Sequence, residues 1–286
     1  MKRSVITAVV LVVLGFAVYA VVDRERRLSS VSVMSGLRVR HLLTPARIAQ
    51  IPHTLGRDFD FTSSDSVLFL ARDALLDLSE SGSGLTVTRL TDDSRIESFA
   101  WDAANKAILT IGGGYLGQLS ASGESVDALP VPPGTRLSPS SRPGIVYLHG
   151  GDPTGGHRLY VFREGGTYEI LIQLPDPIGA VADNAAATYV LAGESIYRIG
   201  SDRVRHVVAL NAGELGEPVI SISVNREDTI LFFATSRQVF ALQAAVALTI
   251  VNDAGGLLRT HDDQLFVWDS KRLVLFSVGP LTALSR

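Results

Sequence analysis

IESFAWDAANKAILTIGGGYLGQL, residues 96–119, carries the pattern on which the fold depends. Apolar and polar residues alternate in its first part, a polar turn follows at 102–105, and glycines 112–114 join two further apolar segments. Alternation with a period of two indicates half-buried strands. Asp, Asn and Gly favour tight turns. The stretch therefore predicts three consecutive antiparallel strands joined by short connections.

This unit recurs along the chain with a period near 40 residues. Successive gaps between the centres of its second strand are 40, 38, 43, 42 and 34 residues. Those centres are Phe69, Leu109, Tyr147, Val190, Phe232 and Phe266. A fourth strand segment ends five of the units, at 85–90, 125–131, 169–174, 204–210 and 246–251. Four strands in each unit at this period indicate the blades of a β-propeller. We therefore predict an all-β, six-bladed propeller over residues 59–286.

The sixth unit contains three strand segments before Arg286. LRVRHLLT at 37–44 resembles the fourth strand LTVTRLT at 85–91. We expect the 37–44 segment to pair with the third strand of the sixth blade, because closing the ring covers an exposed sheet edge. Residues 28–58 are then a linker and a ring-closing strand.

Other architectures fit this pattern less well. A β-sandwich has no reason to keep the period through six units, and a doubly wound α/β fold needs amphipathic helices between its strands. Only residues 238–248, QVFALQAAVAL, have a helix-like composition. They match the third and fourth strands of the neighbouring units.

The first 27 residues have a different character. Residues 4–22, from Ser4 to Val22, are uncharged and apolar. As a helix these 19 residues span about 28 Å, close to the ~30 Å hydrocarbon thickness of a bilayer. Lys2 and Arg3 precede the run and DRERR at 23–27 ends it. Residues 1–27 are therefore predicted to be a signal anchor with one transmembrane helix, which makes this a single-pass membrane protein.

Two alternatives for this segment stay open. A secretory signal peptide could be cleaved after Ala20, although the apolar run continues past that point. A buried core helix would need polar residues within the run. The charges on the two sides of the run are nearly equal, but a short charged tail usually stays in the cytoplasm. We therefore expect the propeller to be extracytoplasmic, either periplasmic or extracellular.

Composition excludes several classes of protein. The 286 residues include no cysteine, so disulfide scaffolds, Cys-ligated metals and thiol catalysis are ruled out. Residues 1–27 hold five basic and two acidic residues, which leaves 21 basic and 27 acidic residues in the remainder. A mildly acidic body without a basic stripe argues against nucleic acid as a partner.

The blades resemble those of the NHL, YVTN and SMP-30-like propeller group, whose units read as an apolar strand, a turn containing Asp or Asn, and another apolar strand. The resemblance covers residues 59–281 and marks an architecture rather than an activity. The SMP-30-like enzymes hold a divalent cation in the channel with Glu, Asn and Asp from separate blades. Those ligands cannot be matched here residue by residue, so we predict no cofactor and no metal.

Candidate binding residues come from one face of the predicted ring. Loops between blades share that face with loops from second to third strands. The longest of them is HGGDPTGGH at 149–157. Its His149, Asp152 and His157 are possible metal ligands, but the spacing matches no helix-borne metal motif. Long loops often bind partners. The residues predicted to contact a partner are His149, Asp152, His157, Arg136, Arg237 and Trp268.

Other candidate motifs have ordinary structural explanations. Glycines 112–114 lack the Gly-Lys-Ser/Thr of a phosphate-binding loop and fit a hairpin turn. No G-x-S-x-G nucleophile elbow occurs. Asp183, Asn184 and Asn225 lie in turns between first and second strands, on the opposite face, where their turn-forming role suffices.

Two functional hypotheses follow. The first is a membrane-anchored propeller acting as a protein-binding scaffold or accessory subunit of a membrane or envelope assembly. Its partners would be other membrane or envelope proteins, with the lipid bilayer contacted through residues 4–22. The alternative is a membrane-tethered small-ligand or metal-binding enzyme or sensor, of the SMP-30-like lactonase or hydrolase type. The alternative predicts that Asp, Glu, Asn or His from at least three blades converge at the channel mouth. A channel lined only by apolar or small residues would contradict it.

Overall fold

The computed structural model describes residues 31–44, 56–62, 66–72, 74–81, 84–119, 125–152, 154–163, 167–201 and 203–285. The predicted anchor at 1–27 lies outside the described residues, as does the segment 45–55. Within the described part of the chain, no helix has both the length and the apolar character to cross a membrane.

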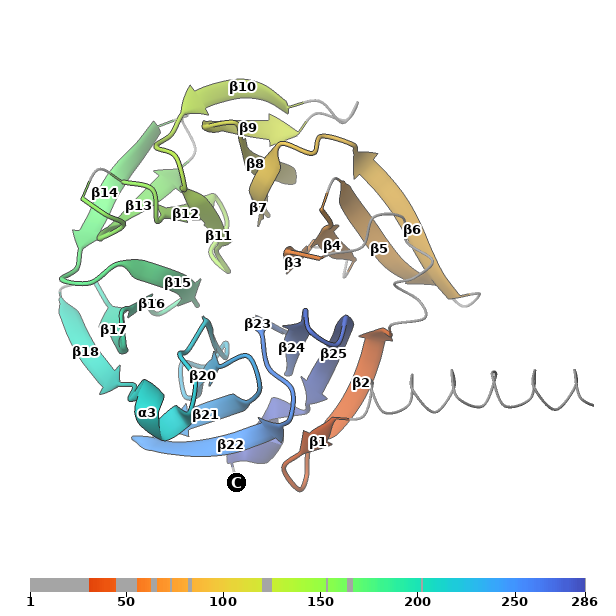
Figure 1. The fold of residues 1–286 in the computed structure, drawn as a ribbon, viewed down its shortest axis with the longest axis vertical. Helices are drawn as coiled ribbons and strands as arrows, with labels where there is room; N and C mark the ends of the chain where they lie inside the picture. Colours follow the sequence, from red (N-terminus) through yellow and green to blue (C-terminus); the bar gives the residue numbers. More distant parts are fainter. Residues whose placement is uncertain are drawn as a thin grey trace, which may run out of the picture.

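Six antiparallel sheets stand around a common centre, like the blades of a propeller (Figure 1). The first strand of each repeat lies nearest the centre and the fourth lies at the rim. The first three blades are β3 (Asp58–Phe61), β4 (Val67–Leu70), β5 (Leu75–Ser81) and β6 (Gly84–Thr91); β7 (Ile96–Asp102), β8 (Ala107–Gly112), β9 (Tyr115–Leu119) and β10 (Ser125–Pro130); and β11 (Arg136–Pro139), β12 (Ile145–His149), β13 (Arg158–Arg163) and β14 (Thr167–Gln173). The all-β, six-bladed architecture predicted from the repeat is therefore confirmed.

The remaining blades complete the ring. They are β15 (Ile178–Asp183), β16 (Thr188–Ala192), β17 (Ser195–Ile199) and β18 (Val204–Ala209); β19 (Ser221–Val224), β20 (Leu231–Ala234), β21 (Val239–Gln243) and β22 (Val246–Asn252); and β23 (Leu257–His261), β24 (Gln264–Asp269) and β25 (Val274–Gly279). Helix α3 (Ala212–Leu215) lies between the fourth and fifth blades, and a 3₁₀ turn at Leu281–Ser285 follows β25. Residues 238–248 contribute to β21 and β22 and form no helix.

The ring is closed by the N-terminal segment, as the sequence predicted. Strand β2 (Arg38–Leu43) pairs antiparallel with β25 and is the outermost strand of the sixth blade. Its last residue, Leu43, is 1% exposed. A short preceding strand, β1 (Ser32–Val33), pairs with the outer edge of β22 and gives the fifth blade five strands. The sequence predicted a linker here and not a strand, because two residues are too few to show a period.

The hydrophobic core fills the spaces between neighbouring blades. Phe69 of the first blade and Trp268 of the sixth meet edge to face, with ring centroids 4.9 Å apart. Both side chains are almost completely buried. A further apolar cluster joins the fifth and sixth blades around Phe232 and Phe276. Burying such aromatic side chains supplies a large part of the stabilising free energy.

Polar side chains also join the blades, because each innermost strand has an unpaired edge whose N–H and C=O groups need partners. Six contacts cross the six blade boundaries in turn. They are Trp101 N to Asp60 Oδ2 at 2.9 Å, Leu137 N to Ser98 Oγ at 2.9 Å, Ser141 N to Asp183 Oδ1 at 2.7 Å, Asn184 Nδ2 to Asn225 O at 3.0 Å, Leu258 N to Ser221 Oγ at 3.0 Å, and Arg259 Nη2 to Asp58 Oδ1 at 3.1 Å. Most buried polar residues near the channel thus have a structural role.

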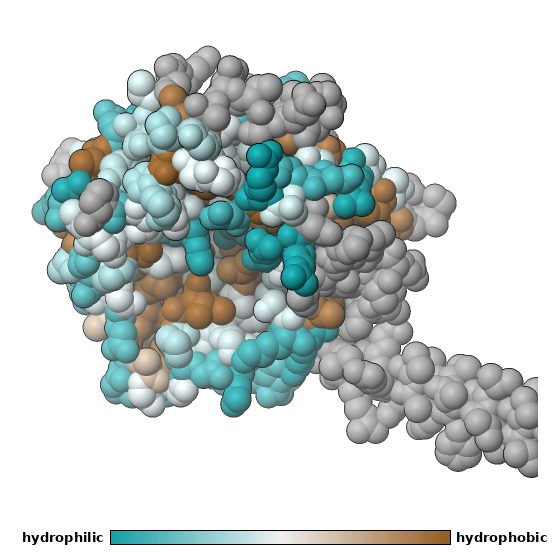
Figure 2. Space-filling view, turned by 45° about the horizontal axis from the view of Figure 1, so that its top comes forward, coloured by the Kyte–Doolittle hydropathy of each residue, from teal (hydrophilic) through white to brown (hydrophobic). Residues whose placement is uncertain are grey.

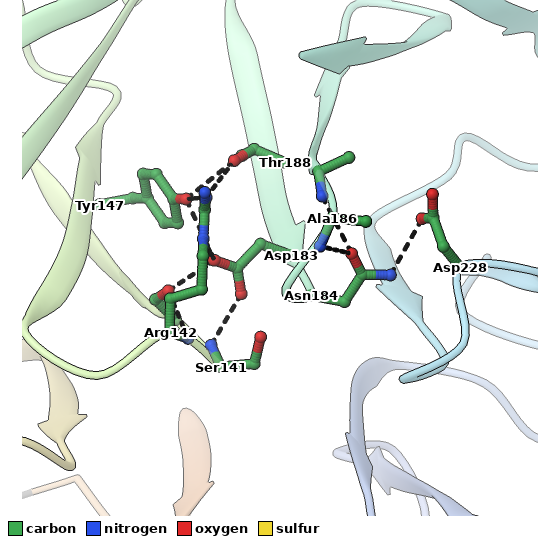
Figure 3. Close-up of polar contacts among 10 residues, drawn as sticks. Ser141, Arg142, Tyr147, Asp183, Asn184, Ala186, Thr188 and Asp228 are labelled. Atoms are coloured by element: carbon green, nitrogen blue, oxygen red, sulfur yellow. Dashed lines mark hydrogen bonds and ion pairs between the residues drawn. The ribbon is translucent and has the colours of Figure 1, made fainter. Parts of the chain in front are cut away.

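The densest of these contacts lies between the third and fourth blades (Figure 3). Arg142 Nε donates to Asp183 at 2.9 Å, and Tyr147 Oη and Thr188 Oγ1 lie 2.8 Å apart. Burial, followed by the nearby Asp183 carboxylate, raises the pKa of Tyr147 to about 12. A phenol with that pKa stays protonated at neutral pH, so it serves as a hydrogen-bonding group. This cluster fixes the blades and supplies no nucleophile.

Candidate functional site

A cavity of about 550 Å³ occupies one mouth of the central channel. Its charged lining residues stand at or near the start of inner strands, beside the loops between blades. They are Arg57, Asp58, Glu97, Arg136 and Arg259. This is the face on which the sequence analysis expected binding. In a space-filling view, apolar side chains gather near the middle of the ring and hydrophilic ones surround them (Figure 2).

Three blades contribute Asp, Glu or His to this cavity. Asp58 comes from β3, Glu97 from β7 and His149 from the end of β12. Convergence from at least three blades was the observation that the enzyme or sensor hypothesis required. The lining includes apolar Val181, Leu137 and Ile222, but it is far from exclusively apolar.

Asp58 and Arg259 form an ion pair across the ring closure. Their side chains are 19% and 17% exposed, and the N–O distance is 3.1 Å. Burial raises the pKa of Asp58, and the Arg259 charge opposes that rise. The Arg259 guanidinium also lies over the Phe59 ring, 5.9 Å from its centroid. The pair fixes the first blade against the sixth and holds Arg259 at the channel.

Glu97 and Arg136 are available to a ligand. Both are exposed and line the cavity, Glu97 from the second blade and Arg136 from the third. Neither side chain has a hydrogen bond or ion pair to another described residue. Inner-strand side chains elsewhere bind the next blade, so these two charges have no comparable structural explanation.

His149 and Ser138 form a buried pair at the wall of the cavity. His149 Nε2 lies 3.0 Å from Ser138 Oγ, and its Nδ1 lies 3.4 Å from the carbonyl oxygen of Ile178. A carbonyl accepts only, so Nδ1 carries the proton and Ser138 donates to Nε2. Burial lowers the pKa of His149 to about 4. An imidazole with that pKa is a weak base, and no carboxylate orients it. We therefore assign the pair to packing and to the shape of the cavity.

The donor set does not fit the divalent cation that the resemblance implied. No group of three or more His, Asp or Glu side chains in the described part of the chain is arranged to hold a metal ion. Asp58 is committed to Arg259, and Arg136 brings a further positive charge to the same cavity. A site of this composition repels a cation, so no chemical step is derived through a metal.

The loop at 149–157 is packed against its neighbours rather than extended. Asp152 accepts the backbone N–H groups of Thr154 and Arg158, at 2.7 Å and 3.1 Å. A Cβ added to Gly151 would lie 2.2 Å from the Pro133 carbonyl oxygen. The glycines therefore permit a close approach between backbones, and Asp152 holds the turn together.

The predicted partner-binding residues do not form one surface. His149 and Asp152 are buried, while His157 contacts the Leu174 carbonyl at 3.2 Å through Nδ1. Arg237 is exposed and pairs with Glu217 at 2.9 Å. Trp268 is 1% exposed, and its indole N–H donates to the Gly56 carbonyl at 3.3 Å. A partner cannot reach Trp268, so its assignment to a binding surface was wrong. Of the six residues, Arg136 and His149 line the channel cavity.

Two predictions about turns are confirmed. Gly113 and Gly114 have φ values of 60° and 82° in the hairpin between β8 and β9, where glycine has no steric penalty. Asn225 Oδ1 accepts the N–H groups of Thr229 and Ile230 at 2.9 Å and 2.8 Å. Asp183 does more than the turn role predicted for it, because it also binds Ser141 and Arg142 of the third blade.

The opposite mouth has another cavity, of about 490 Å³, in which carboxylates predominate over cations. Asp60, Asp183, Arg226, Arg259 and Asp262 are its charged lining residues, and Arg259 lines both cavities. Burial raises the pKa of Asp60 to about 6. Asp60 and Asp183 already bind neighbouring blades.

No family model matches the sequence, and no curated protein matches it. Solved structures do resemble the fold. A gluconolactonase from Xanthomonas campestris has a TM-score of 0.63 and 14% identity, covering 86% of this chain and 90% of its own. A luciferin-regenerating enzyme has a TM-score of 0.62 and 12% identity, with 85% and 95% covered. A putative gluconolactonase has a TM-score of 0.60 and 11% identity, with 86% and 93% covered.

At this identity the similarity shows the fold alone. The predicted resemblance to SMP-30-like propellers is confirmed at that level. The scaffold hypothesis is corrected, because these neighbours are named as small-molecule enzymes and the channel mouth gathers titratable side chains from three blades. The hypothesis went wrong because it rested on the lack of a catalytic motif in the linear sequence. Here the candidate groups Asp58, Glu97 and His149 are single residues in separate repeats, 39 and 52 positions apart.

Proposed function

We propose that this chain is a small-molecule hydrolase that opens lactones or related esters in the cavity at the channel mouth. The observation that carries the proposal is the convergence of Asp58, Glu97 and His149 from three blades, together with Arg136 and Arg259. The fold shared with gluconolactonases supports the same class of reaction.

The cavity offers the two functions that ester hydrolysis needs. The Glu97 carboxylate has no bonded partner among the described residues and can accept a proton from water. The water oxygen attacks the carbonyl carbon, and negative charge develops on the carbonyl oxygen. Arg259 supplies positive charge to stabilise that oxygen. The acyl C–O bond then breaks, and the proton held by Glu97 passes to the departing alkoxide.

Buried groups around the cavity hold these charges in place. The Asp58 carboxylate binds Arg259 Nη2, which limits where the guanidinium can move. His149 stays neutral at physiological pH, because burial lowers its pKa to about 4, and it fills the wall beside Ser138. Removing Asp58 should therefore weaken turnover indirectly, through the position of Arg259.

We also propose that residues 4–22 tether the enzyme to a membrane, with the propeller extracytoplasmic. The uncharged run of 19 residues and the basic residues that flank it support this location. Protease protection of the full chain in sealed vesicles tests the topology. Digestion of the propeller in vesicles that expose their cytoplasmic side would contradict it.

The hydrolase proposal is tested by incubating the purified full chain with lactones of four, five and six ring members and with simple esters. Acid release in a pH-stat measures turnover. The proposal predicts hydrolysis that survives treatment with EDTA, because no step uses a divalent cation. Failure to hydrolyse any compound of the panel, or loss of all activity in EDTA, would contradict it.

A further inference from the structure

Three guanidinium groups line the channel-mouth cavity. Arg57 precedes β3, Arg136 begins β11 and Arg259 lies in the middle of β23. They come from three different blades, so the closed ring brings them together from distant parts of the sequence. The carboxylates of the same lining are Asp58 and Glu97.

The bonded contacts leave this mouth with an excess of positive charge. Asp58 and Arg259 pair directly at 3.1 Å and largely neutralise each other. Arg57 Nη2 donates to the Arg72 carbonyl at 2.9 Å, and a carbonyl carries no net charge. Arg136 has no bonded partner among the described residues. Two guanidinium charges therefore remain against the single carboxylate of Glu97.

His149 lies in the wall of the same cavity, beside Arg136 and Arg259. Burial is the main cause of its lowered pKa, and the charges of Arg136 and Arg259 lower it further. Both guanidinium groups are therefore close enough to His149 for their charges to act on it. The opposite mouth is lined by three carboxylates, Asp60, Asp183 and Asp262, against Arg226 and the shared Arg259, so it has no such excess.

We propose that the channel mouth selects small molecules with a permanent carboxylate group, which Arg136 binds, over neutral molecules of the same shape. This rests on the proposed function for its location and specifies the class of substrate. A planar guanidinium can donate two parallel hydrogen bonds to a carboxylate. Glu97 lies in the same cavity and disfavours a second negative charge nearby, so a monoanion with hydroxyl groups fits better than a polyanion.

The test compares matched pairs of probes that differ in one group. D-gluconate is paired with D-glucitol, and L-lactate with propane-1,2-diol, so each carboxylate is replaced by a hydroxymethyl group. Isothermal titration of the full chain at constant ionic strength measures the affinities. At least one carboxylate should bind about 10- to 100-fold more tightly than its neutral partner, which is the range of a charged hydrogen-bonding contact.

Three variants locate the effect. Arg136→Gln should remove most of the preference for the carboxylate, and Arg136→Lys should restore part of it, because charge returns without the two-pronged geometry. Arg226→Gln is the matched control, since Arg226 lines the opposite mouth. It should leave affinity unchanged.

The proposal is overturned if no carboxylate binds the wild-type chain more tightly than its neutral partner, or if Arg226→Gln weakens binding as much as Arg136→Gln. Tighter binding of inorganic phosphate than of every carboxylate would also contradict it. Carboxylate binding without hydrolysis of any lactone would leave this inference standing and remove the proposed function. Hydrolysis of neutral lactones without anion preference would do the reverse.

Discussion

Replacement of His149 by Gln should remove a defined part of the protein's sensitivity to acid. Burial holds the pKa of His149 at about 4 in the folded chain, against an ordinary value of 6.5. The unfolded chain therefore binds a proton at higher pH than the folded chain. The stabilising contribution of the neutral histidine is complete above pH 6.5 and is lost as the pH falls towards 4.

The size of the effect follows from the two pKa values. Between pH 7.5 and pH 4.5 the unfolded chain takes up a proton at His149 before the folded chain does. This uptake alone lowers the free energy of unfolding by about 2.5 kcal/mol. A glutamine keeps a donor and an acceptor for Ile178 and Ser138 but does not titrate. The stability difference between wild type and His149→Gln should therefore shrink by about 2.5 kcal/mol over that interval.

Urea unfolding followed by tryptophan fluorescence measures this difference. Trp101 in the second blade and Trp268 in the sixth report on distant parts of the ring. Other titrating groups, including Asp60, are common to both proteins, so they cancel in the difference. A difference that stays constant from pH 7.5 to pH 4.5 would refute the reasoning, because it would mean that His149 can take up a proton without leaving its buried position.

Three further predictions concern the contacts between blades. Asp60→Asn should change the pH dependence of stability in the opposite direction, because the pKa of Asp60 is raised to about 6 in the folded chain. As the pH falls from 7 to 4, the free energy of unfolding of wild type should rise by about 2 kcal/mol relative to the variant in the same urea assay. Asp183→Ala should lower the free energy of unfolding by about 3–5 kcal/mol, because it leaves the partly buried Arg142 without its charged partner. Asp93→Ala, which breaks an exposed ion pair with Arg95, should lower the free energy of unfolding by less than about 1 kcal/mol. Equal losses of stability in Asp183→Ala and Asp93→Ala would contradict the structural role given to Asp183. Leu43→Ala in the ring-closing strand should lower the free energy of unfolding by about 2–5 kcal/mol, because the side chain is buried. Ile170→Ala, at a side chain that is 54% exposed, should change the stability measured by thermal unfolding very little.

The repeat made the architecture predictable from sequence. Each blade has its own alternating pattern, and the period near 40 residues fixes the number of blades. Ring closure by β2 was also predictable, because 37–44 has the composition of a fourth strand. Strand β1 was not, since a pairing of two residues depends on the edge of β22 and leaves no periodic signal.

The candidate site was harder to predict for a physical reason. Asp58, Glu97 and Arg259 stand in three different inner strands, and only the closed ring brings them into one cavity. A charged residue in an inner strand was a usable signal, because charged residues rarely enter a protein interior without a partner or a function. Loop length pointed instead to Asp152 and His157, which stabilise a turn.

The contact network also explains why many polar residues near the channel are poor functional candidates. Ser98 and Ser221 bind unpaired backbone groups of the next blade. Other blade boundaries use different side chains for the same purpose, among them Asp60 and Asn184. Glu97 and Arg136 line the same cavity without comparable hydrogen bonds, so they are the better candidates for binding a ligand.

The most direct test of the account is the rate of lactone hydrolysis by Glu97→Gln beside that by Asp262→Asn. The two carboxylates line opposite mouths of the same channel. The account predicts that Glu97→Gln lowers kcat by about 100-fold or more, as loss of a general base does, while Asp262→Asn keeps the wild-type rate. Wild-type turnover by Glu97→Gln, or an equal loss in both variants, would contradict the claim that the chemistry takes place at the first mouth.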